Sequence, residues 1–490
     1  MRLSKSQYLR GLQCPKSLWL HNFRPDLRAH VSPGLQHIFD QGRRIGELAR
    51  RRYPGGVLIK ADHQHIPEAL QETAAALKRG AKILFEAAFV HDDVLARPDI
   101  LVKKGSGWDF IEVKSSTDVK EAYLPDLAVQ RYVLEGAGLG VRQACLLRVN
   151  NEYVRRGDID PQKLFQLEDV GALTAPHLKQ APANLAALQN VLAGPDMPQV
   201  SIGARCTAPY ACDFMDFCWK HVPDYSVYDL KRADFNTINE LRSLGVMRLE
   251  DIPPDFGLTD SQEIQVRVAK SGEPHIDGPG IKKCLAGLVY PLHFLDFETV
   301  SLAIPPYDGL RPFQALPFQA SLHVQDKPGA ELGHFEYLGE PKSDPRPGLV
   351  KFLVERIASQ GSVVAYNIGF EGARLAELAD AFPKGAKALN GMQKRLWDLI
   401  VPFRSSLFVH PDMHGSASMK AVLPALVPGM SYESLAISNG ETAFLAYESL
   451  MTGKVSAAQT KKTMAALREY CGQDTLGMVE ILKVLEQYAI

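Results

Sequence analysis

The sequence predicts a multidomain α/β protein, and three observations lead to that prediction. First, its 490 residues are too many for one ordinary hydrophobic core, so at least two domains are expected. Second, hydrophobic residues make up 46% and charged residues 23% of the chain, which matches globular proteins and excludes the disordered and fibrous classes. Third, short β-rich runs alternate with helical stretches in two separate regions, 83–149 and 290–490.

A first domain is expected over residues 1–221. Residues 1–53 are typical of helices, with Ser4 as an N-cap, and a helical pattern returns up to about residue 195. Between them the sequence predicts strand, strand, strand, helix and strand inside a helical wrapper. These elements are ILFEAAFV from Ile83, VLARPDILV from Val94, WDFIEVK from Trp108, a helix at 121–138, and QACLLRV from Gln143.

The rest of the chain divides near residue 290. Residues 222–289 predict a helical linker in which two short helices break at Gly245. This linker also resembles a helix-hairpin-helix, but its first turn lacks the expected glycine, so a spacer is favoured. Residues 290–490 predict a second, three-layer α/β domain that closes on a long helix. Its expected elements are strands near 292–298, 314–325, 332–339 and 362–366, with a helix near 345–359.

Hydropathy predicts a cytoplasmic protein, and the charge pattern leaves open whether its basic N-terminal region binds a polyanion. No apolar run approaches the length of a membrane span, and the first residues lack the apolar stretch of a signal peptide. The net charge is −1, yet residues 1–60 hold twelve Lys and Arg against three acids. Such a basic region is what binding to a phosphate backbone requires, although a solvated helix face would give the same count.

Acidic residues and a lysine gather on the predicted strands of the first domain. Asp99 follows Pro98, and Glu112 and Lys114 lie two apart on the next strand, so their side chains share a face. Two carboxylates can hold Mg²⁺ or Mn²⁺, which activates water for phosphodiester hydrolysis, and a neighbouring lysine can orient that water or neutralise developing charge. Glu86, on the preceding β-rich run, is a further candidate ligand.

With Gln130 on the helix that follows, this order resembles the RecB subgroup of PD-(D/E)XK nucleases. The resemblance implies a restriction-endonuclease-like core with Asp99 and Glu112 as metal ligands and with Lys114 and Gln130 as catalytic residues. Family members also carry a metal-binding His on a preceding helix, where this chain has Gly46. Either His37 or Glu86 is then expected to supply the third ligand.

Cysteines cluster around the end of the same domain. Cys206, Cys212 and Cys218 fall within 13 residues, and Cys14 lies far upstream. Seven cysteines in an expected cytoplasmic chain favour metal ligation or burial over disulfides. One distant and three clustered cysteines resemble the iron–sulfur nucleases, such as AddB and the nuclease of CRISPR adaptation. That resemblance implies a [4Fe–4S] cluster, with zinc and simple burial as alternatives. The remaining cysteines, expected in the core, are Cys145, Cys284 and Cys471.

The second domain carries another set of acids. Asp296 and Glu298 are two apart on a predicted strand, and Tyr470 and Asp474 are four apart on a helix. Two metal ions about 4 Å apart need several convergent carboxylates, and a tyrosine can orient the attacking water. Between these pairs, the segment from Asn367 through Phe370 brings Glu371 to the start of a helix.

This order resembles the DnaQ-like exonucleases, which have an RNase H-like fold, in the subtype whose third motif contains a tyrosine. The resemblance implies a two-metal 3′–5′ exonuclease with Asp296, Glu298, Glu371 and Asp474 as Mg²⁺ or Mn²⁺ ligands and Tyr470 as a catalytic residue. The family has Asp where this chain has Glu371, and Asp398 is the alternative ligand.

The two resemblances together are those of a bacterial family that fuses both domains. The leading hypothesis is a metal-dependent nuclease with two hydrolytic centres that acts on DNA ends. A nucleic-acid-binding scaffold with one or both sites inactive is the first alternative, and an RNA-processing exonuclease is the second. Protein partners are not specified by the sequence.

Overall fold

The computed structural model describes residues 3–489, which form two compact units. One unit runs up to His221 and includes the segment Leu302–Gln314, and the other comprises Val222–Ser301 and the chain from Ala315 onward. Each unit combines helices with at least one mixed sheet. The predicted multidomain α/β class is therefore confirmed.

The N-terminal unit contains a six-stranded sheet of order β2-β3-β6-β7-β8-β9 and a three-stranded sheet of order β1-β5-β4. Helix α5 follows the central strand β7, which makes β7 and β8 parallel neighbours. The elements are β1 Leu3–Ser4, α1 Lys5–Gln13, α2 Pro15–Phe23, α3 Pro33–Arg50, β2 Val57–Leu58, α4 Ile66–Lys78, β3 Ile83–Phe85, β4 Phe89–His91, β5 Val94–Ala96, β6 Ile100–Lys104, β7 Gly107–Lys114, α5 Leu124–Gly136, β8 Val141–Val149, α6 Pro161–Leu164, β9 Phe165–Asp169, α7 Gly171–Ala193 and α8 Met215–Trp219.

Two of the predicted strands are each broken in the middle, and the chain changes sheet at both breaks. Glu86, at φ 56°, separates β3 from β4, and Pro98–Asp99 separates β5 from β6. The two breaks lie opposite each other, because the Glu86 N–H donates to the Asp99 carbonyl at 3.2 Å. Both candidate acids, Glu86 and Asp99, therefore lie outside the strands, where the chain passes from one sheet to the other.

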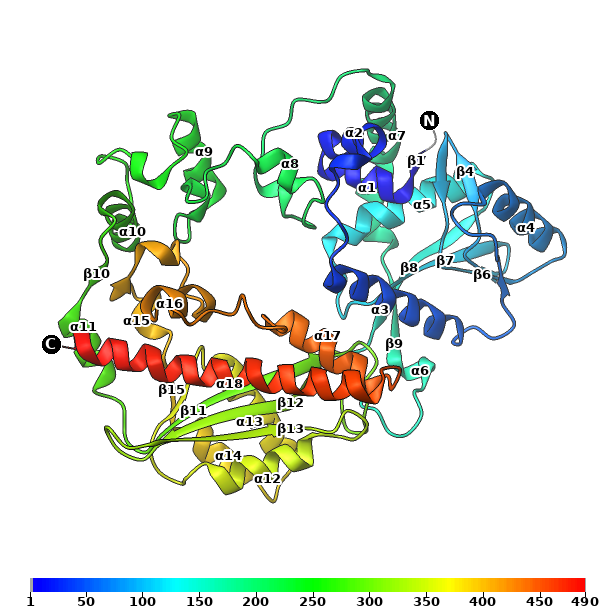
Figure 1. Cartoon of the computed structure of the whole chain (residues 1–490). Coiled ribbons are helices and arrows are strands. Elements are labelled where there is room, and N and C mark those ends of the chain that lie inside the picture. Colours follow the sequence, from blue (N-terminus) through cyan, green and yellow to red (C-terminus); the bar gives the residue numbers. More distant parts are fainter. Residues whose placement is uncertain (1–2, 490) are drawn as a thin grey trace. The chain divides into compact units, whose positions relative to one another are not determined.

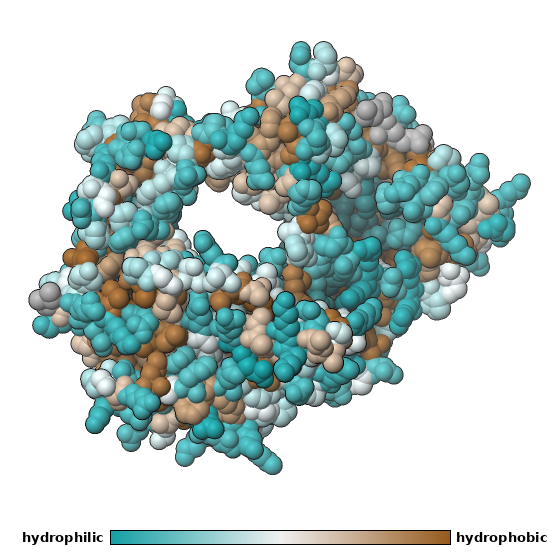
Figure 2. All heavy atoms as spheres, in the orientation of Figure 1, coloured by the Kyte–Doolittle hydropathy of each residue, from teal (hydrophilic) through white to brown (hydrophobic). Residues whose placement is uncertain are grey.

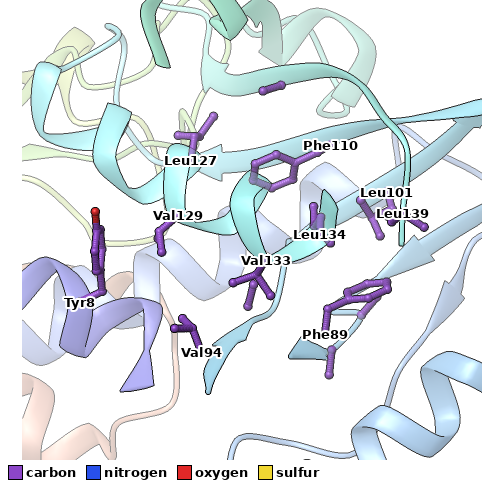
Figure 3. Packing of buried hydrophobic residues seen from close by; sticks show 14 of the residues in the cluster. Tyr8, Phe89, Val94, Leu101, Phe110, Leu127, Val129, Val133, Leu134 and Leu139 are labelled. Atoms are coloured by element: carbon purple, nitrogen blue, oxygen red, sulfur yellow. The ribbon is translucent and has the colours of Figure 1, made fainter. Parts of the chain in front are cut away.

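Helix α5 packs its apolar residues into the largest core cluster of the N-terminal unit. Figure 3 shows Leu127, Val133 and Leu134 of this helix among side chains from the sheets, including Phe110 of β7. All four are fully buried. Burial of such side chains stabilises the unit by about 1.5–3 kcal/mol each. It also fixes the helix over the strand that carries Glu112.

The C-terminal unit has a five-stranded sheet of order β13-β12-β11-β14-β15, in which β11, β14 and β15 are parallel and β12 and β13 antiparallel. Its elements are α9 Phe235–Ser243, α10 Asp260–Ser271, β10 His275–Ile276, α11 Gly278–Leu285, β11 Leu292–Ser301, β12 Ala315–Gln325, β13 Leu332–Leu338, α12 Arg346–Arg356, β14 Val363–Ala365, α13 Gly369–Ala381, α14 Ala386–Gln393, β15 Leu396–Asp398, α15 Val401–Arg404, β16 Phe408–Val409, α16 Met419–Leu426, α17 Gly440–Met451 and α18 Ala457–Tyr488.

Helices cover both faces of this sheet, in the expected three layers. The long helix α18 lies across one face, against β11, β12 and β13, while α12, α13 and α14 lie on the other (Figure 1). The strands and the helix expected between residues 292 and 366 agree with β11 to β14 and α12 within a few residues. The short strands β15 and β16 follow the last strand that the sequence predicted, near 362–366, and were not expected.

Residues 222–289 pack around a small hydrophobic core and belong to the C-terminal unit. Helix α9 ends at Ser243, and Gly245 follows it with φ 80°, the left-handed conformation that commonly ends a helix. The expected break at Gly245 is present. Strand β10 then pairs with β16, which ties this segment to the rest of the unit.

Hydrophilic residues cover much of the face seen in Figure 2, with apolar residues scattered between them. Across residues 3–489, no helix combines the length and the apolar character that crossing a membrane would require.

A buried polar seam holds α18 to the sheet. The Thr475 hydroxyl lies 2.7 Å from the Ser321 hydroxyl and 2.8 Å from Nδ1 of His323, and all three residues are buried. Two residues before Ser321 on β12, the side-chain amide of Gln319 donates to the Leu467 carbonyl at 2.8 Å. Because buried polar groups must be paired, these bonds set the register of the helix against the strand.

Thr475→Val should therefore destabilise the C-terminal unit. The substitution keeps the volume of the side chain but leaves the buried ring of His323 without its hydrogen-bond partner, which costs about 1–3 kcal/mol of unfolding free energy, while the Ser321 hydroxyl keeps its contact with His334. Urea denaturation of the full chain measures the loss. Thr475→Ser, which keeps the hydroxyl, is the control, and equal stability of the two variants would contradict the role of the seam.

Candidate metal-binding sites

Three carboxylates converge on the sheet of the C-terminal unit. Asp296 and Glu298 alternate along β11 on the face that α18 covers, and α18 brings Asp474 to them. One oxygen atom of each carboxylate lies within 4.8 Å of the others. Glu298 and Asp474 are buried, and Asp296 is partly buried. The structure thus brings together three of the four acids that the sequence singled out here.

The electrostatics of this cluster are those of uncompensated negative charge. Burial, together with the charge of Glu371, raises the pKa of Asp296 to about 8. Burial and the neighbouring acids Asp296 and Asp474 raise the pKa of Glu298, and burial with Asp296 raises that of Asp474. Like charges in a low dielectric repel strongly, so the ionised cluster calls for cations.

Glu371, the fourth candidate, lies at the start of α13 and is buried. Its Oε2 has no hydrogen-bond partner among the described residues, and burial, followed by the charge of Asp398, raises its pKa to about 8. Asp398 instead accepts the backbone N–H groups of Asn367 at 2.8 Å and Ile400 at 3.3 Å. Asp398 therefore orders the turn through its Oδ1, whereas the free oxygen of Glu371 is buried.

Two residues that the sequence analysis did not single out complete this cluster. The Tyr432 hydroxyl donates to Oδ1 of Asp474 at 2.6 Å, and its ring packs edge-on against Tyr470, 5.9 Å between centroids. Lys420 places its Nζ over both rings, 5.7 Å from the Tyr432 centroid and 5.9 Å from that of Tyr470. Tyr432 lies outside helices and strands, where no sequence period marks it. Cys471, expected only in the core, is buried and donates to Oδ2 of Asp296 at 3.5 Å.

The N-terminal acids and lysines also meet, around Glu112. Its Oε1 accepts from Lys114 at 3.0 Å and from Lys5 at 2.7 Å, and its Oε2 accepts from Gln130 at 2.9 Å. Asp126 bonds both Lys114, at 2.7 Å, and Gln130, at 3.0 Å. Lys5 and Asp126 were missed by the sequence analysis. Asp126 lies one helical turn before Gln130, the spacing that could have revealed it.

The charge balance at Glu112 is opposite to that in the C-terminal unit. Burial opposes ionisation of Glu112, but Lys114 and Lys5 outweigh it and hold its pKa at about 2. Asp99, whose Oδ2 accepts the Val113 N–H at 2.6 Å, has its pKa raised by burial and by Glu112. The protein's own ammonium groups therefore supply positive charge here.

The two candidates for a third ligand lie in different places. The Glu86 N–H donates to the Asp99 carbonyl, and the Glu86 carboxylate lies 3.7 Å from the guanidinium of Arg50 on α3. His37 lies on the same helix thirteen residues before Arg50, about 20 Å away along the axis, next to Gln41. Of the two, the structure brings Glu86 to the site and leaves His37 apart. A Cβ at Gly46 would meet nothing within 4 Å, so the family's usual histidine position is open.

All four expected cysteine ligands line one pocket. Cys14 joins α1 to α2, Cys206 and Cys212 lie in turns linked by a 2.8 Å backbone bond, and Cys218 lies in α8. All are partly exposed, free thiols. Across residues 3–489, no three cysteine sulfurs lie within 4.8 Å of one another.

Polar contacts hold the two walls of this pocket together. Arg10 of α1 makes a bidentate pair with Asp213, 2.6 and 3.0 Å, and Arg28 also pairs with Asp213. Gln13 donates to the carbonyls of Arg205 and Tyr210. The beginning and the end of the N-terminal domain are thus joined around the cysteines.

Comparisons with known proteins cover only part of the chain. Residues 293–418 match a family described as "Domain of unknown function (DUF2779)". The chain is 25% identical over 205 residues to "Uncharacterized protein MG366 homolog" of Mycoplasma pneumoniae, covering 38% of this chain and 31% of the relative. It is also 25% identical over 210 residues to "Uncharacterized protein UU173" of Ureaplasma parvum serovar 3, covering 38% and 30%.

The chain spans about a third of the length of these curated relatives. The family match includes Asp296, Glu298 and Glu371 but ends before Lys420 and α18.

The charge of the C-terminal cluster predicts an unusual pH dependence. Because folding raises the pKa of Asp296 from 3.8 to about 8, the folded state binds more protons in that interval, and stability falls as pH rises through it. In EDTA, urea unfolding of Asp296→Asn should show a smaller fall between pH 5 and 8.5, by about 1 kcal/mol or more. Mn²⁺ should restore stability at pH 8.5 to the unaltered protein and not to the variant.

The exposed carboxylate Asp380, on α13 of the same unit, offers the matched control. Asp380→Asn should leave both the pH dependence and the Mn²⁺ effect unchanged. An equal fall in stability for Asp296→Asn and the unaltered protein would contradict the charge assignment.

Proposed function

We propose that this protein is a metal-dependent nuclease whose C-terminal unit removes nucleotides from the 3′ ends of nucleic acids, with a second nuclease centre in its N-terminal unit. The observation that carries the proposal is the convergence of Asp296, Glu298 and Asp474 to within 4.8 Å, with Tyr470 one helical turn before Asp474. Two buried carboxylates and one partly buried carboxylate, with no cationic partner at hydrogen-bonding distance among residues 3–489, are the donor set that Mg²⁺ or Mn²⁺ prefers.

The residues of this cluster fit the roles that such hydrolysis needs. Asp296, Glu298 and Asp474 would hold the ions, and Glu371, with its unpaired buried oxygen, would complete the set. When bound, the ions supply an activated water and stabilise charge on the phosphate. The hydroxyl of Tyr470 would orient the attacking water. The strand order β13-β12-β11-β14-β15, with α18 against β11, supports the RNase H-like layout implied by the resemblance to DnaQ-like exonucleases.

The N-terminal unit supports a PD-(D/E)XK-like centre. Asp99, Glu112, Lys114 and Gln130 come from the elements that the resemblance requires, and Lys114 and Gln130 both contact Glu112. Its alternative role is that of a nucleic-acid-binding scaffold. The observation that favours the alternative is Lys5, which at 2.7 Å already satisfies the carboxylate that a metal would need.

The cysteine pocket supports an iron–sulfur cluster over zinc. Tetrahedral zinc with bonds of about 2.3 Å would require sulfur atoms about 3.8 Å apart. The cysteines Cys14, Cys206, Cys212 and Cys218 surround one cavity without such an approach, as thiolates bound to four separate irons would. A bound cluster would close a loop of some two hundred residues, which would restrict the unfolded chain.

The proposed substrate is DNA, because a basic first domain suits a phosphate backbone, and RNA is the alternative that the same chemistry permits. The proposed location is the cytoplasm, where thiols such as the seven cysteines of this chain stay reduced.

Exonuclease activity is tested in the full chain with the N-terminal site silenced by Glu112→Ala. A 5′-labelled single-stranded DNA should shorten progressively from its 3′ end with Mn²⁺ and not with EDTA. Adding Asp296→Asn should lower the rate by about a hundredfold or more, because a ligand of the ions is lost. Tyr470→Phe should lower the rate less and spare Mn²⁺ binding, and the Asp380→Asn control should change nothing.

Intact 3′ ends on both DNA and RNA, in a protein that binds Mn²⁺, would refute the exonuclease proposal. Cleavage that survives Asp296→Asn but needs Glu112 would assign nuclease activity to the N-terminal unit. If the Asp296→Asn protein with an intact Glu112 binds DNA and cuts nothing, the scaffold role of the N-terminal unit is favoured instead.

The iron assignment is tested on anaerobically purified full chain. The protein should be brown and hold about four iron atoms, and Cys212→Ser should lose the colour and lower the unfolding temperature, because the loop-closing ligand set is broken. Cys284→Ser, at a partly exposed cysteine outside the pocket, is the matched control. Stoichiometric zinc without iron would overturn the assignment.

A further inference from the structure

Lys420 occupies a position on α16 that costs stability. It is the second residue of a helix that begins at Met419, after the N-cap Ser418. The N-terminus of a helix carries partial positive charge, so acids are favoured in the first turn and a lysine is not. The side chain is exposed, yet its Nζ lies over the buried rings of Tyr432 and Tyr470. Helix stability therefore does not explain why a lysine stands here.

The packing of α16 against α18 fixes where Lys420 points. Leu423 lies three residues after Lys420, hence on the same face of α16. A Cβ at Gly477 of α18 would come within 2.9 Å of Leu423 Cδ2, so glycine there lets the two helices approach closely without displacing the Leu423 side chain. Glycine inside a helix costs about 1 kcal/mol relative to alanine. This cost accompanies the close packing of α16 on α18, which places Lys420 beside the acidic cluster.

The ammonium of Lys420 has no acceptor of its own. Within residues 3–489 it makes neither a hydrogen bond nor an ion pair within 4.0 Å, although the charges of Asp474 and Glu298 act on it. Its side chain is exposed to solvent, while Tyr432 and Asp474 beside it are buried. Its three N–H donors lie over the two tyrosine rings next to the cluster and make no hydrogen bond, so they are available to a phosphate bound there.

We propose that Lys420 is a catalytic residue of the C-terminal site, which contacts a non-bridging oxygen of the scissile phosphodiester. This inference rests on the proposed exonuclease function. Tyr432 is the matching positioning residue, because its hydroxyl donates to Asp474 and its ring lies under the Lys420 ammonium, 5.7 Å from the ring centroid. Such a cation stabilises the charge that grows on the phosphate oxygens in the transition state.

The chemical step balances without a proton from Lys420. The oxygen of a water molecule attacks phosphorus, the new P–O bond forms, and the bond from phosphorus to the 3′ oxygen of the preceding nucleotide breaks. The attacking water releases a proton to solvent, and the departing 3′ oxygen takes one from solvent. The products are a nucleoside 5′-monophosphate and a chain with a new 3′ hydroxyl. Lys420 stays protonated and contributes only its charge.

The experiment compares Lys420→Met with Lys462→Met, an exposed lysine of α18, in the full chain carrying Glu112→Ala. Lys420→Met should lower kcat on single-stranded DNA about a hundredfold or more with Mn²⁺. Its affinity for Mn²⁺, measured by calorimetry, should stay equal or become tighter, because a positive charge near Glu298 and Asp474 is removed. Its unfolding temperature should match that of the control.

A second readout does not depend on activity. An oligonucleotide whose last linkage is a methylphosphonate lacks the charged oxygen that Lys420 would contact. With Ca²⁺ in place of Mn²⁺, the protein with Lys420 should bind this oligonucleotide several-fold more weakly than the unmodified one. Lys420→Met should discriminate much less between the two, and the Lys462→Met control should discriminate fully. Lys420→Gln repeats the comparison if the Met variant fails to fold.

The outcomes separate the two proposals. If Lys420 variants keep full kcat or full discrimination while the parent protein degrades DNA, the inference about Lys420 is wrong and the exonuclease stands. If they lose kcat together with Mn²⁺ affinity and thermal stability, Lys420 is structural and the inference is likewise overturned. If the parent protein itself degrades nothing, the proposed function fails first.

Discussion

Repulsion among buried carboxylates is the constraint on which the C-terminal unit depends. Asp296, Glu298 and Asp474 approach within 4.8 Å and lack a cation at hydrogen-bonding distance among the described residues, so the fold must hold them together against their own charges. The seam of Thr475, Ser321 and His323 and the close packing at Gly477 fix α18 in register. Sites that hold reactive groups in unfavourable proximity commonly trade stability for function in this way.

The parts of this site that the sequence predicted are those that local geometry determines. Asp296 and Glu298 share a face because strands alternate with a period of two, and Tyr470 and Asp474 share one because a helix returns after about one turn. The same reasoning placed Glu112 beside Lys114, which the structure brings to 3.0 Å. Strands β11 to β13 were predictable too, since each runs for seven residues or more.

What the sequence did not predict depends on tertiary contacts without a period. Tyr432 reaches Asp474 from an irregular segment, and Lys5 reaches Glu112 across more than a hundred residues. The two broken strands at Glu86 and Asp99 were also missed, because their apolar runs continue through a change of sheet that only the packed structure imposes. The sequence left Asp398 and Glu371 as alternative metal ligands, and the choice between them needed their hydrogen bonds.

The two acidic sites of the chain use opposite electrostatic designs. In the N-terminal unit, Lys114 and Lys5 neutralise Glu112, so the folded protein is stable there without added cations, and any divalent ion must displace Lys5 from its carboxylate. In the C-terminal unit, the nearest lysine, Lys420, remains over the aromatic rings and leaves the acids uncompensated. At a pH where the C-terminal acids are ionised, a divalent ion is expected to stabilise that unit without breaking an ion pair, whereas at Glu112 its binding free energy is reduced by the loss of an existing one. The two sites should therefore fill at different metal concentrations, the C-terminal one first.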